Sequence, residues 1–520
     1  MAVLPITPYQ PITDQAFTGE IEIELTPAMF QNVVALSGKS MIFFDSCMFK
    51  KITIIYDQAL TYDLIDINFM DCFIENIEVK SAVGKNLGVY FHNSIIPHGG
   101  LQEGELQSVQ LTNCITNGFF IKNAGLVRIE YVEYTVYPLR WRALLRKLGN
   151  KEQFNKVLEH KVAYHLEDIE QLHVEGKPET NGAPGLYQTA IDKEKEYRYR
   201  YRLSASEKAS MNVNLNIKYS SSDKAKVTAV KNIYLRSLSM QGTASGKITV
   251  EDCTIDRLYL GKLVPKGELV FYYITTQQKR VAISELPGPD AVGKLDEVSK
   301  VEIHQCTLDN TWFDNFDFAA YSSVSLFRTR FSKTIFSACN FPDDYKQFDN
   351  FLSVENIHYP HKKKDNYHKD MYEIFLQLRK ALEATGNFQE SLKLHAVSND
   401  ALREIKRLSW WDARILCINK ISNNHGISLK KAFWGFWISS AVVYIVYLLT
   451  LGRIFNCQAA FDPSLIGYYF AFIDLTHRND FLVSKGDFGH FTLAVDFLGK
   501  AVVGFYIFQF VAAFRKYGKK

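Results

Sequence analysis

Two neighbouring segments of this 520-residue chain carry side chains suited to binding an anionic ligand. Residues 197–202 alternate strictly between Tyr and Arg, and residues 212–218 alternate Asn or Lys with Val, Leu and Ile. If both segments are strands that pair as a hairpin, one face is apolar and the other displays guanidinium, carboxamide and ammonium groups. Guanidinium groups bind phosphates, and carboxamides bind the edges of adenine. The predicted ligand-binding residues are therefore Arg198, Arg200, Arg202, Asn212, Asn214, Asn216 and Lys218, the alternative being a half-buried hairpin whose basic face is only solvated.

A second set of polar residues interrupts an apolar C-terminal region. Residues 465–473 are apolar but too few to cross a bilayer, and Asp474, Thr476 and His477 follow them directly. Asp496 and Lys500 lie four residues apart near the start of the next apolar segment. Ionisable groups in lipid are costly and usually face protein or water, so these five residues are predicted to line a pore. The alternative for Asp496 and Lys500 is a pair that reaches the membrane interface.

Two C-terminal segments have the length and composition of membrane spans. Residues 432–451 carry no charge and, at about 1.5 Å per residue, extend roughly 30 Å, the thickness of a bilayer core. Residues 495–514 form the second apolar segment. Basic residues precede the first segment and follow the second, which predicts that both ends of the chain are cytoplasmic. The first Lys or Arg is Lys39, so no secretory signal is expected, and the large N-terminal part of the chain is predicted to lie in the cytoplasm.

The remaining chain shows a recurring pattern around cysteine. Six of the eight cysteines stand beside a small or polar residue and near a segment of alternating apolar residues. Buried structural thiols in a stack of short coils explain this pattern, because a single coil cannot bury its inner face alone. The pattern predicts a mainly β chain built on a right-handed parallel β-helix.

Composition and patterning together suggest five regions. The predicted domains are a first β-helical part (1–137), an inserted α/β subdomain with the hairpin (138–230), a second β-helical part (231–342), a helical linker (343–428) and a two-helix transmembrane channel domain (429–520). The content of 14% aromatic residues excludes a disordered chain, and the net charge of +4 confines any basic surface to local patches.

Catalytic and metal-binding motifs receive no support from the sequence. Residues 242–247 look like a phosphate-binding loop but are one residue short, and Ile248 replaces the required Ser or Thr. Asp309, Asp314 and Asp317 could serve as acid–base carboxylates in a β-helical hydrolase, although turn residues explain them better. We therefore predict that the chain is not an enzyme and needs neither a metal nor another cofactor.

The order of β repeats, helical linker and helix–short helix–helix resembles bacterial β-helical repeat proteins with a C-terminal two-span ion-channel domain. The whole layout resembles the DNA-gated channel effectors of the Hailong anti-phage system. The resemblance implies a homo-oligomer, by analogy with two-span channels a tetramer, that contacts membrane lipids and is controlled by a single-stranded oligodeoxyadenylate from a partner nucleotidyltransferase. It implies a location in the bacterial inner membrane and a role in abortive antiviral defence. No Thr-Val-Gly-Tyr-Gly follows Phe472, which favours a non-selective pore. The alternative function is a non-conducting, membrane-tethered scaffold for protein partners.

Overall fold

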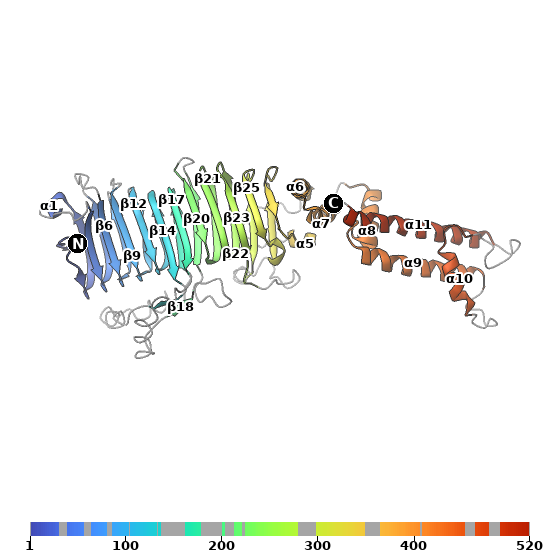
Figure 1. The fold of residues 1–520 in the computed structure, drawn as a ribbon, viewed down its shortest axis with the longest axis horizontal. Helices are drawn as coiled ribbons and strands as arrows, with labels where there is room; N and C mark the ends of the chain where they lie inside the picture. Colours follow the sequence, from blue (N-terminus) through green and yellow to red (C-terminus); the bar gives the residue numbers. More distant parts are fainter. Residues whose placement is uncertain are drawn as a thin grey trace. The chain divides into compact units, whose positions relative to one another are not determined.

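The computed structural model divides the chain into two compact units. The first comprises Met1–Pro342 and Lys346–Pro360, and the second Asp343–Tyr345 and His361–Lys520 (Figure 1). The structure describes residues 2–30, 39–56, 64–80, 86–102, 105–132, 134–136, 162–177, 200–202, 213–220, 224–278, 298–348, 365–405, 408–452, 463–477 and 489–518.

The first unit is mainly β and is built on one large parallel sheet, as the alternating apolar pattern predicts. Its strands form two ladders, between which the chain alternates. The first ladder contains β2 (Ile12–Thr13), β4 (Lys39–Asp45), β6 (Leu64–Met70), β9 (Leu87–His92), β12 (Leu106–Thr112), β14 (Ala124–Val132), β17 (Gln171–Lys177), β20 (Val227–Lys231), the first part of β22 (Lys247–Pro265), β23 (Leu269–Thr275), β25 (Thr311–Phe316) and β27 (Ile335–Ser337).

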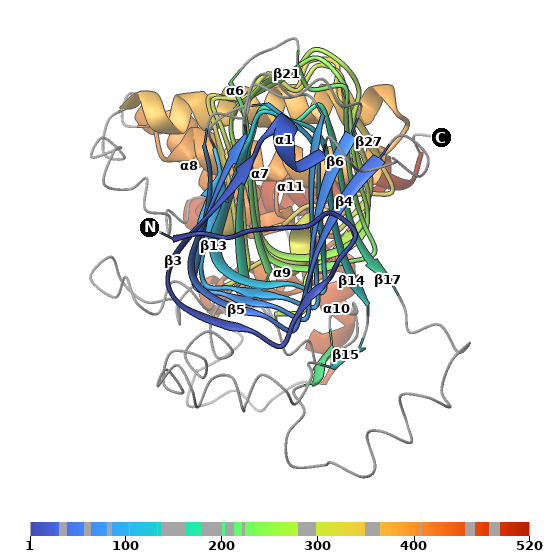
Figure 2. The same ribbon diagram turned by 90° about the vertical axis from the view of Figure 1, so that its left-hand side faces the viewer.

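The second ladder runs through the strands between these. It contains β1 (Ala2–Val3), β3 (Ala16–Leu25), β5 (Met48–Tyr56), β7 (Phe73–Ile74), β8 (Asn76–Lys80), β10 (Ile95–Ile96), β11 (His98–Leu101), β13 (Ile115–Lys122), β16 (Val162–Glu167), β19 (Val213–Tyr219), β21 (Tyr234–Ala244), the second part of β22, β24 (Lys300–His304) and β26 (Ser323–Phe327). Figure 2 looks along the stack, with β3, β5 and β13 on one side and β4, β6, β14 and β17 on the other.

Aromatic side chains of successive strands stack in the core. Phe44, Phe69 and Phe91 are register partners on three neighbouring strands, and their ring centroids lie 5.1 Å apart at interplanar angles of 12° and 9°. All three are fully buried. In-register parallel pairing places like residues above one another, so a repeated Phe becomes a continuous stack, and each such pair contributes about 0.5–1.5 kcal/mol beyond its buried area.

The cysteine pattern has its origin at the turns between strands. The residue before each of the six cysteines has a left-handed backbone with φ between 49° and 56°; these residues are Ser46, Asp71, Asn113, Asp252, Gln305 and Ala338. Asn and Asp tolerate this conformation best, which explains the polar neighbours. The cysteine that follows is buried in every case, so the prediction of buried structural thiols is confirmed.

The buried thiols satisfy main-chain oxygen atoms at these turns. The Cys72 thiol donates to Phe44 O on the neighbouring strand, at 3.5 Å, and to Met70 O, at 3.2 Å. The Ser94 and Thr329 hydroxyls bond in the same way at equivalent turns. A small side chain with one hydrogen-bond donor is therefore what each of these turns requires.

The predicted hairpin between residues 197–202 and 212–218 is wrong. β18 (Arg200–Arg202) pairs antiparallel with β15 (Tyr134–Val136), whereas β19 lies in the large sheet between β16 and β21. The boundaries of the predicted insertion change accordingly, because β16, β17, β19 and β20 all belong to the large sheet. The apolar side chains of β19 are buried in the core of the large sheet. This burial stabilises β19 in the sheet more than a hairpin with residues 200–202 would. Residues 137–161, 178–199 and 203–212 lie outside the described residues.

Short helices complete the first unit and lead into the second. They are α1 (Pro27–Phe30), the 3₁₀ helix η5 (Phe318–Ala320) and α5 (Tyr345–Phe348). The predicted helical linker contains a helical hairpin formed by α6 (Asp365–Ala384) and α7 (Phe388–Arg403). Gly386 has φ of +79° at the turn, and the Asn387 side chain accepts from the Glu390 N–H to begin α7.

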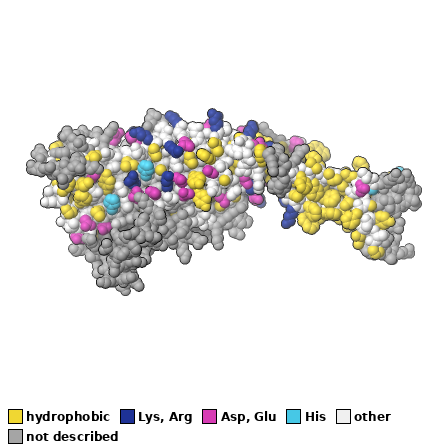
Figure 3. Space-filling model, in the orientation of Figure 1, with side chains coloured by type: hydrophobic (Ala, Val, Ile, Leu, Met, Phe, Trp, Pro, Cys, Tyr) yellow, Lys and Arg dark blue, Asp and Glu magenta, His cyan; other side chains and the backbone are white. Residues whose placement is uncertain are grey.

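The rest of the second unit consists of α8 (Trp410–Asn423), α9 (Leu429–Thr450), α10 (Ser464–Phe472) and α11 (His490–Gly518). Both α9 and residues 490–514 of α11 are long and apolar enough to cross a membrane. Only 28% of the most apolar stretch of each is buried, which is unlike the core helix of a soluble protein. Figure 3 shows hydrophobic side chains gathered over these helices.

The turn geometry predicts which thiols are unreactive. Burial raises the pKa of Cys47 to about 11 and the pKa values of Cys114 and Cys253 to about 12, so none of the three is a thiolate at pH 8. We expect iodoacetamide at pH 8 to alkylate the partly exposed Cys417 and to leave all six turn cysteines unmodified, as measured by peptide mass spectrometry. Full alkylation in guanidinium chloride is the control. Alkylation of Cys72 in the native chain as fast as Cys417 contradicts the structural role.

Candidate functional site

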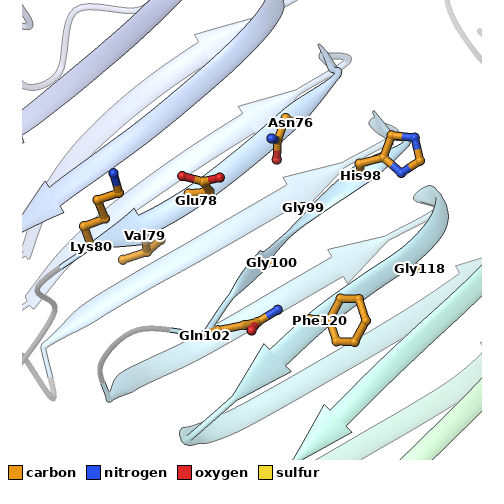
Figure 4. A pocket seen from close by; sticks show the side chains of 10 residues that line it. All are labelled: Asn76, Glu78, Val79, Lys80, His98, Gly99, Gly100, Gln102, Gly118 and Phe120. Carbon is orange, nitrogen blue, oxygen red and sulfur yellow. The ribbon is translucent and has the colours of Figure 1, made fainter. Parts of the chain in front are cut away.

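A depression of about 410 Å³ lies on the outward face of the second ladder, over β8, β11 and β13. Figure 4 shows Asn76 and His98 towards one end of it and Gln102 and Phe120 along one side. Gly99, Gly100 and Gly118 leave the strip between these side chains bare. The depression therefore has a main-chain floor with polar and aromatic side chains around it.

The glycines in this floor cannot readily be replaced. Gly99 has φ of +141° and Gly118 has φ of +110°, conformations that residues with a side chain rarely adopt. A Cβ at Gly100 would lie 3.0 Å from both Gln102 Nε2 and the Cβ of Phe120. Glycines within strands often mark places where another group closely approaches the main chain.

A second depression of about 320 Å³ continues the first over β13, β16, β19 and β21. Gln102 and Phe120 line both, so the two form one groove. We call it the ladder groove; its lining includes His98, Gly99, Gly100, Gln102, Phe120, Lys122, His165, Glu167, Asn216, Lys218, Ser239 and Gln241.

The groove is organised as two columns of side chains that run across the strands. Register pairing aligns one column through Glu78, Gly100, Phe120, His165, Asn216 and Ser239. The adjacent column passes through Lys122, Glu167, Lys218 and Gln241. Side chains between the two columns point into the core, because successive residues of a strand face opposite sides.

Flat groups occupy the centre of the first column. The rings of Phe120 and His165 stack with centroids 4.4 Å apart and an interplanar angle of 13°, and Phe120 is 44% exposed. Burial lowers the pKa of His165, so at neutral pH its ring is uncharged. Asn216 Nδ2 lies 3.3 Å from His165 Nδ1. Such a platform can stack a planar ligand and offer carboxamide groups to its edge.

The second column carries a small excess of positive charge. Glu167 lies between two lysines, 3.2 Å from Lys122 Nζ and 3.3 Å from Lys218 Nζ. Although burial by itself raises the pKa of Glu167, hydrogen bonds from Ser220 and the two lysines lower it overall. With two ammonium groups and one carboxylate, the column can attract a phosphate without binding it tightly.

The groove contains only part of the ligand site predicted from sequence. Asn216 and Lys218 line it, whereas Asn214 uses its side chain on Val162 O and the Ser237 hydroxyl. Arg200 and Arg202 belong to β18, in a separate two-stranded sheet, and Arg198 and Asn212 lie outside the described residues.

The groove also contains residues that the sequence did not identify. The pair Gly99–Gly100 was the signal available in the sequence. Phe120 gave none, because it follows the buried Phe119 and resembles a core residue in the sequence.

The second candidate site lies around α10. This helix packs against α9 and α11 through the buried cluster Tyr444, Tyr447, Leu448, Leu465, Phe472 and Val495. The Tyr444 hydroxyl donates to Leu465 O at 2.6 Å. A Cβ at Gly499 would overlap the Phe472 ring, so α11 accepts α10 only because residue 499 is glycine. A short apolar helix is thus held against two span-length helices.

The five predicted pore residues follow α10 and come together. Asp474 Oδ1 accepts from the Thr476 N–H at 2.9 Å and from its hydroxyl at 2.7 Å. His477 Nε2 lies 2.7 Å from Asp496 Oδ1, and Lys500 Nζ lies 3.2 Å from Asp496 Oδ2. Lys500 Nζ also donates to His477 O at 3.3 Å. We call His477, Asp496 and Lys500 the polar cluster.

Two members of the polar cluster, His477 and Asp496, are shielded from solvent. The side chains of His477 and Asp496 are each only 4% exposed. His477 Nδ1 contacts Asp474 O, and its Nε2 faces the carboxylate of Asp496. The cluster therefore holds a buried carboxylate between His477 and Lys500, and these contacts tie the polar turn to α11.

Comparisons with known proteins add nothing to this geometry. No protein-family model, no curated protein and no solved structure matches the chain significantly. Within the ranges that the structure describes, no three His, Cys, Asp or Glu side chains gather as they would around a metal ion.

The polar cluster predicts a large cost for removing its carboxylate. Asp496→Ala deletes the acceptor for both His477 and Lys500, and we expect it to destabilise the detergent-solubilised chain by about 3 kcal/mol. Asp496→Asn, which keeps an acceptor for His477, should cost less. The midpoint of thermal unfolding measures both variants, with Glu373→Ala on the exposed side of α6 as the control. An unchanged midpoint for Asp496→Ala contradicts the described pairing.

Proposed function

We propose that the chain is an oligomeric, ligand-gated ion channel of the bacterial inner membrane. The observation that carries this proposal is the arrangement of α9, α10 and α11. A helix too short to span a bilayer lies between two helices long enough to do so, and it ends in a polar turn tied to α11 by the polar cluster. Irregular main chain at membrane depth is tolerated where it lines a water-filled path.

The proposed pore needs more than one copy of the chain, because two spans cannot enclose a path by themselves. We propose a homo-oligomer, with four copies favoured by analogy with two-span channels, whose outer surface contacts membrane lipids. The exposed Asp474 and Thr476 are proposed to face the path. The hydrogen bonds from Thr476 lower the pKa of Asp474, which keeps its carboxylate ionised at neutral pH and favours cations without selecting among them.

The first unit is proposed to be a cytoplasmic, right-handed parallel β-helix. The alternation of the chain between two parallel ladders supports this, as do the left-handed residues and buried thiols at the turns. Each coil would then contribute one strand to each ladder and stack on the coil before it.

The ladder groove is the proposed site of the controlling ligand, a nucleotide or single-stranded oligodeoxyadenylate made by a partner nucleotidyltransferase. The stacked Phe120 and His165 suit bases, the carboxamides of Asn216 and Gln241 suit adenine edges, and Lys122 and Lys218 suit phosphates. From β8 to β21 the groove crosses five strand spacings, about 24 Å at about 4.8 Å each, which accommodates several nucleotides. Loss of membrane potential on gating would give the antiviral role.

Ion flux tests the channel and separates it from a scaffold. We expect proteoliposomes containing the full chain to pass monovalent cations, and the flux to change when a single-stranded oligodeoxyadenylate is added. Asp474→Asn keeps an acceptor for Thr476 but removes the charge, so the preference for cations over anions should fall several-fold. Because the pKa of Asp474 is lowered, that preference in the parent chain should be constant from about pH 5 to pH 8.

Glu373→Gln, which removes a charge on the exposed side of α6, is the control and should leave ion preference unchanged. A reconstituted chain that passes no ions with or without the oligonucleotide supports the non-conducting scaffold instead.

Oligonucleotide affinity tests the groove. Phe120→Ala should weaken binding of a fluorescent oligodeoxyadenylate roughly tenfold, because base stacking on an aromatic side chain is worth about 1–3 kcal/mol. Tyr272→Ala removes an equally exposed aromatic side chain from the first ladder and should have no effect. The combined Arg198→Ala, Arg200→Ala and Arg202→Ala variant tests the Tyr/Arg strand separately. Loss of affinity in that variant with none in Phe120→Ala refutes the groove.

A further inference from the structure

Helix α8 turns its apolar side outward. Trp410, Trp411, Ile415, Ile418 and Ile421 are between 50% and 71% exposed. At 100° per residue these five side chains share one side of the helix, and Arg414 lies among them. A surface helix of a soluble protein would place this side against the core.

The other side of α8 carries polar side chains that fix it to the rest of the second unit. Lys420 Nζ lies 2.8 Å from Asp400 Oδ1 on α7. The Asn419 side chain accepts from Gln509 Nε2 of α11 at 3.4 Å, and Asn423 is buried. The exposure of the Trp/Ile side is therefore a consequence of specific contacts that hold α8 in this orientation.

The exposed side of α8 continues into the apolar surface of the proposed spans. Asn424 and Gly426, both with positive φ, turn the chain into α9, and the Ser428 hydroxyl caps α9 by accepting from the Lys431 N–H at 3.2 Å. Phe433 and Trp434, 45% and 56% exposed, extend the apolar surface onto α9. Figure 1 shows α8 beside the first turns of α9 and the last turns of α11.

Positive charge surrounds this surface. Lys430 and Lys431 are exposed in the first turn of α9, and Arg414 Cζ lies 5.1 Å from the ring centroid of Trp410. Trp side chains with neighbouring basic residues are typical of the boundary between lipid headgroups and acyl chains.

We propose that α8 lies along the surface of an anionic lipid leaflet. Its Trp/Ile side enters the headgroup–acyl boundary, and Arg414, Lys430 and Lys431 contact lipid phosphates. Basic residues at such a surface each contribute about 1 kcal/mol when the leaflet is anionic. This inference rests on the proposed membrane position of α9 and α11. It goes further by assigning a lipid-binding role to a helix that precedes both spans.

Spin-label accessibility of the full chain in phosphatidylcholine–phosphatidylglycerol vesicles tests the inference. Single labels are placed at Ile418→Cys, at Asp412→Cys, an exposed position away from the Trp/Ile side of α8, and at Val442→Cys in the middle of α9. Cys417→Ser and Cys457→Ser remove the reactive background. We expect the label at 418 to collide with oxygen, to be shielded from a water-soluble nickel chelate, and to lie about 5–10 Å below the phosphates. The label at 442 should lie deeper, and the label at 412 should be open to nickel.

The remaining outcomes separate this inference from the proposed function. Nickel access at 418 with a lipid-embedded 442 overturns the role of α8 and leaves the channel proposal intact. Shielding of 418 from both oxygen and nickel indicates a protein contact, such as a second copy of the chain, and also overturns it. Nickel access at 442 refutes the membrane position of α9 and the inference with it. An unchanged depth at 418 in pure phosphatidylcholine refutes the requirement for anionic lipid.

Discussion

Parallel, in-register pairing is the constraint on which the first unit depends. Every inner strand must satisfy its N–H and C=O groups on both edges, so the chain must return to the same register after each turn. The left-handed residues at Ser46, Asp71 and Asn113 provide the turn, and the thiols that follow satisfy carbonyl groups that the turn exposes. The Phe stacks are a consequence of the same register.

The ladder groove follows from this register as well. Outward positions align across the strands, so the size of the residue at each step decides whether the surface is filled or hollow. Gly100 empties one step, and Phe120 and His165 fill the next two with stacked rings. A column of flat and polar groups at strand spacing is thereby produced by the strands themselves.

Features set by local patterns could be predicted from the sequence, whereas strand partners could not. The uncharged segment 432–451 depends on composition alone, and it forms most of the apolar helix α9 as predicted. The partner of residues 200–202 depends on which strand end lies nearby, because main-chain hydrogen bonds are the same for any sequence. Phe120 was missed for a related reason: whether Phe119 or Phe120 faces the core is set by the register with β11 and β16, which alternation alone does not determine.

From α8 to α11 the second unit has the reverse polarity of a soluble domain, whereas α6 and α7 bury their apolar side chains. Apolar side chains cover α8, α9 and α11, while hydrogen-bonded polar groups lie between the helices. The Ser440 hydroxyl lies 2.7 Å from that of Tyr469, and the polar cluster pairs Asp496 with His477 and Lys500. In water, exposed apolar area of this extent is unfavourable, and buried charges are better solvated outside. In lipid both costs reverse, because apolar surface is matched by acyl chains and each polar group must find a partner inside the protein. The internal pairing of α9, α10 and α11 is therefore the arrangement that the proposed membrane position requires, and the proposed position of α8 extends it to the level of the headgroups.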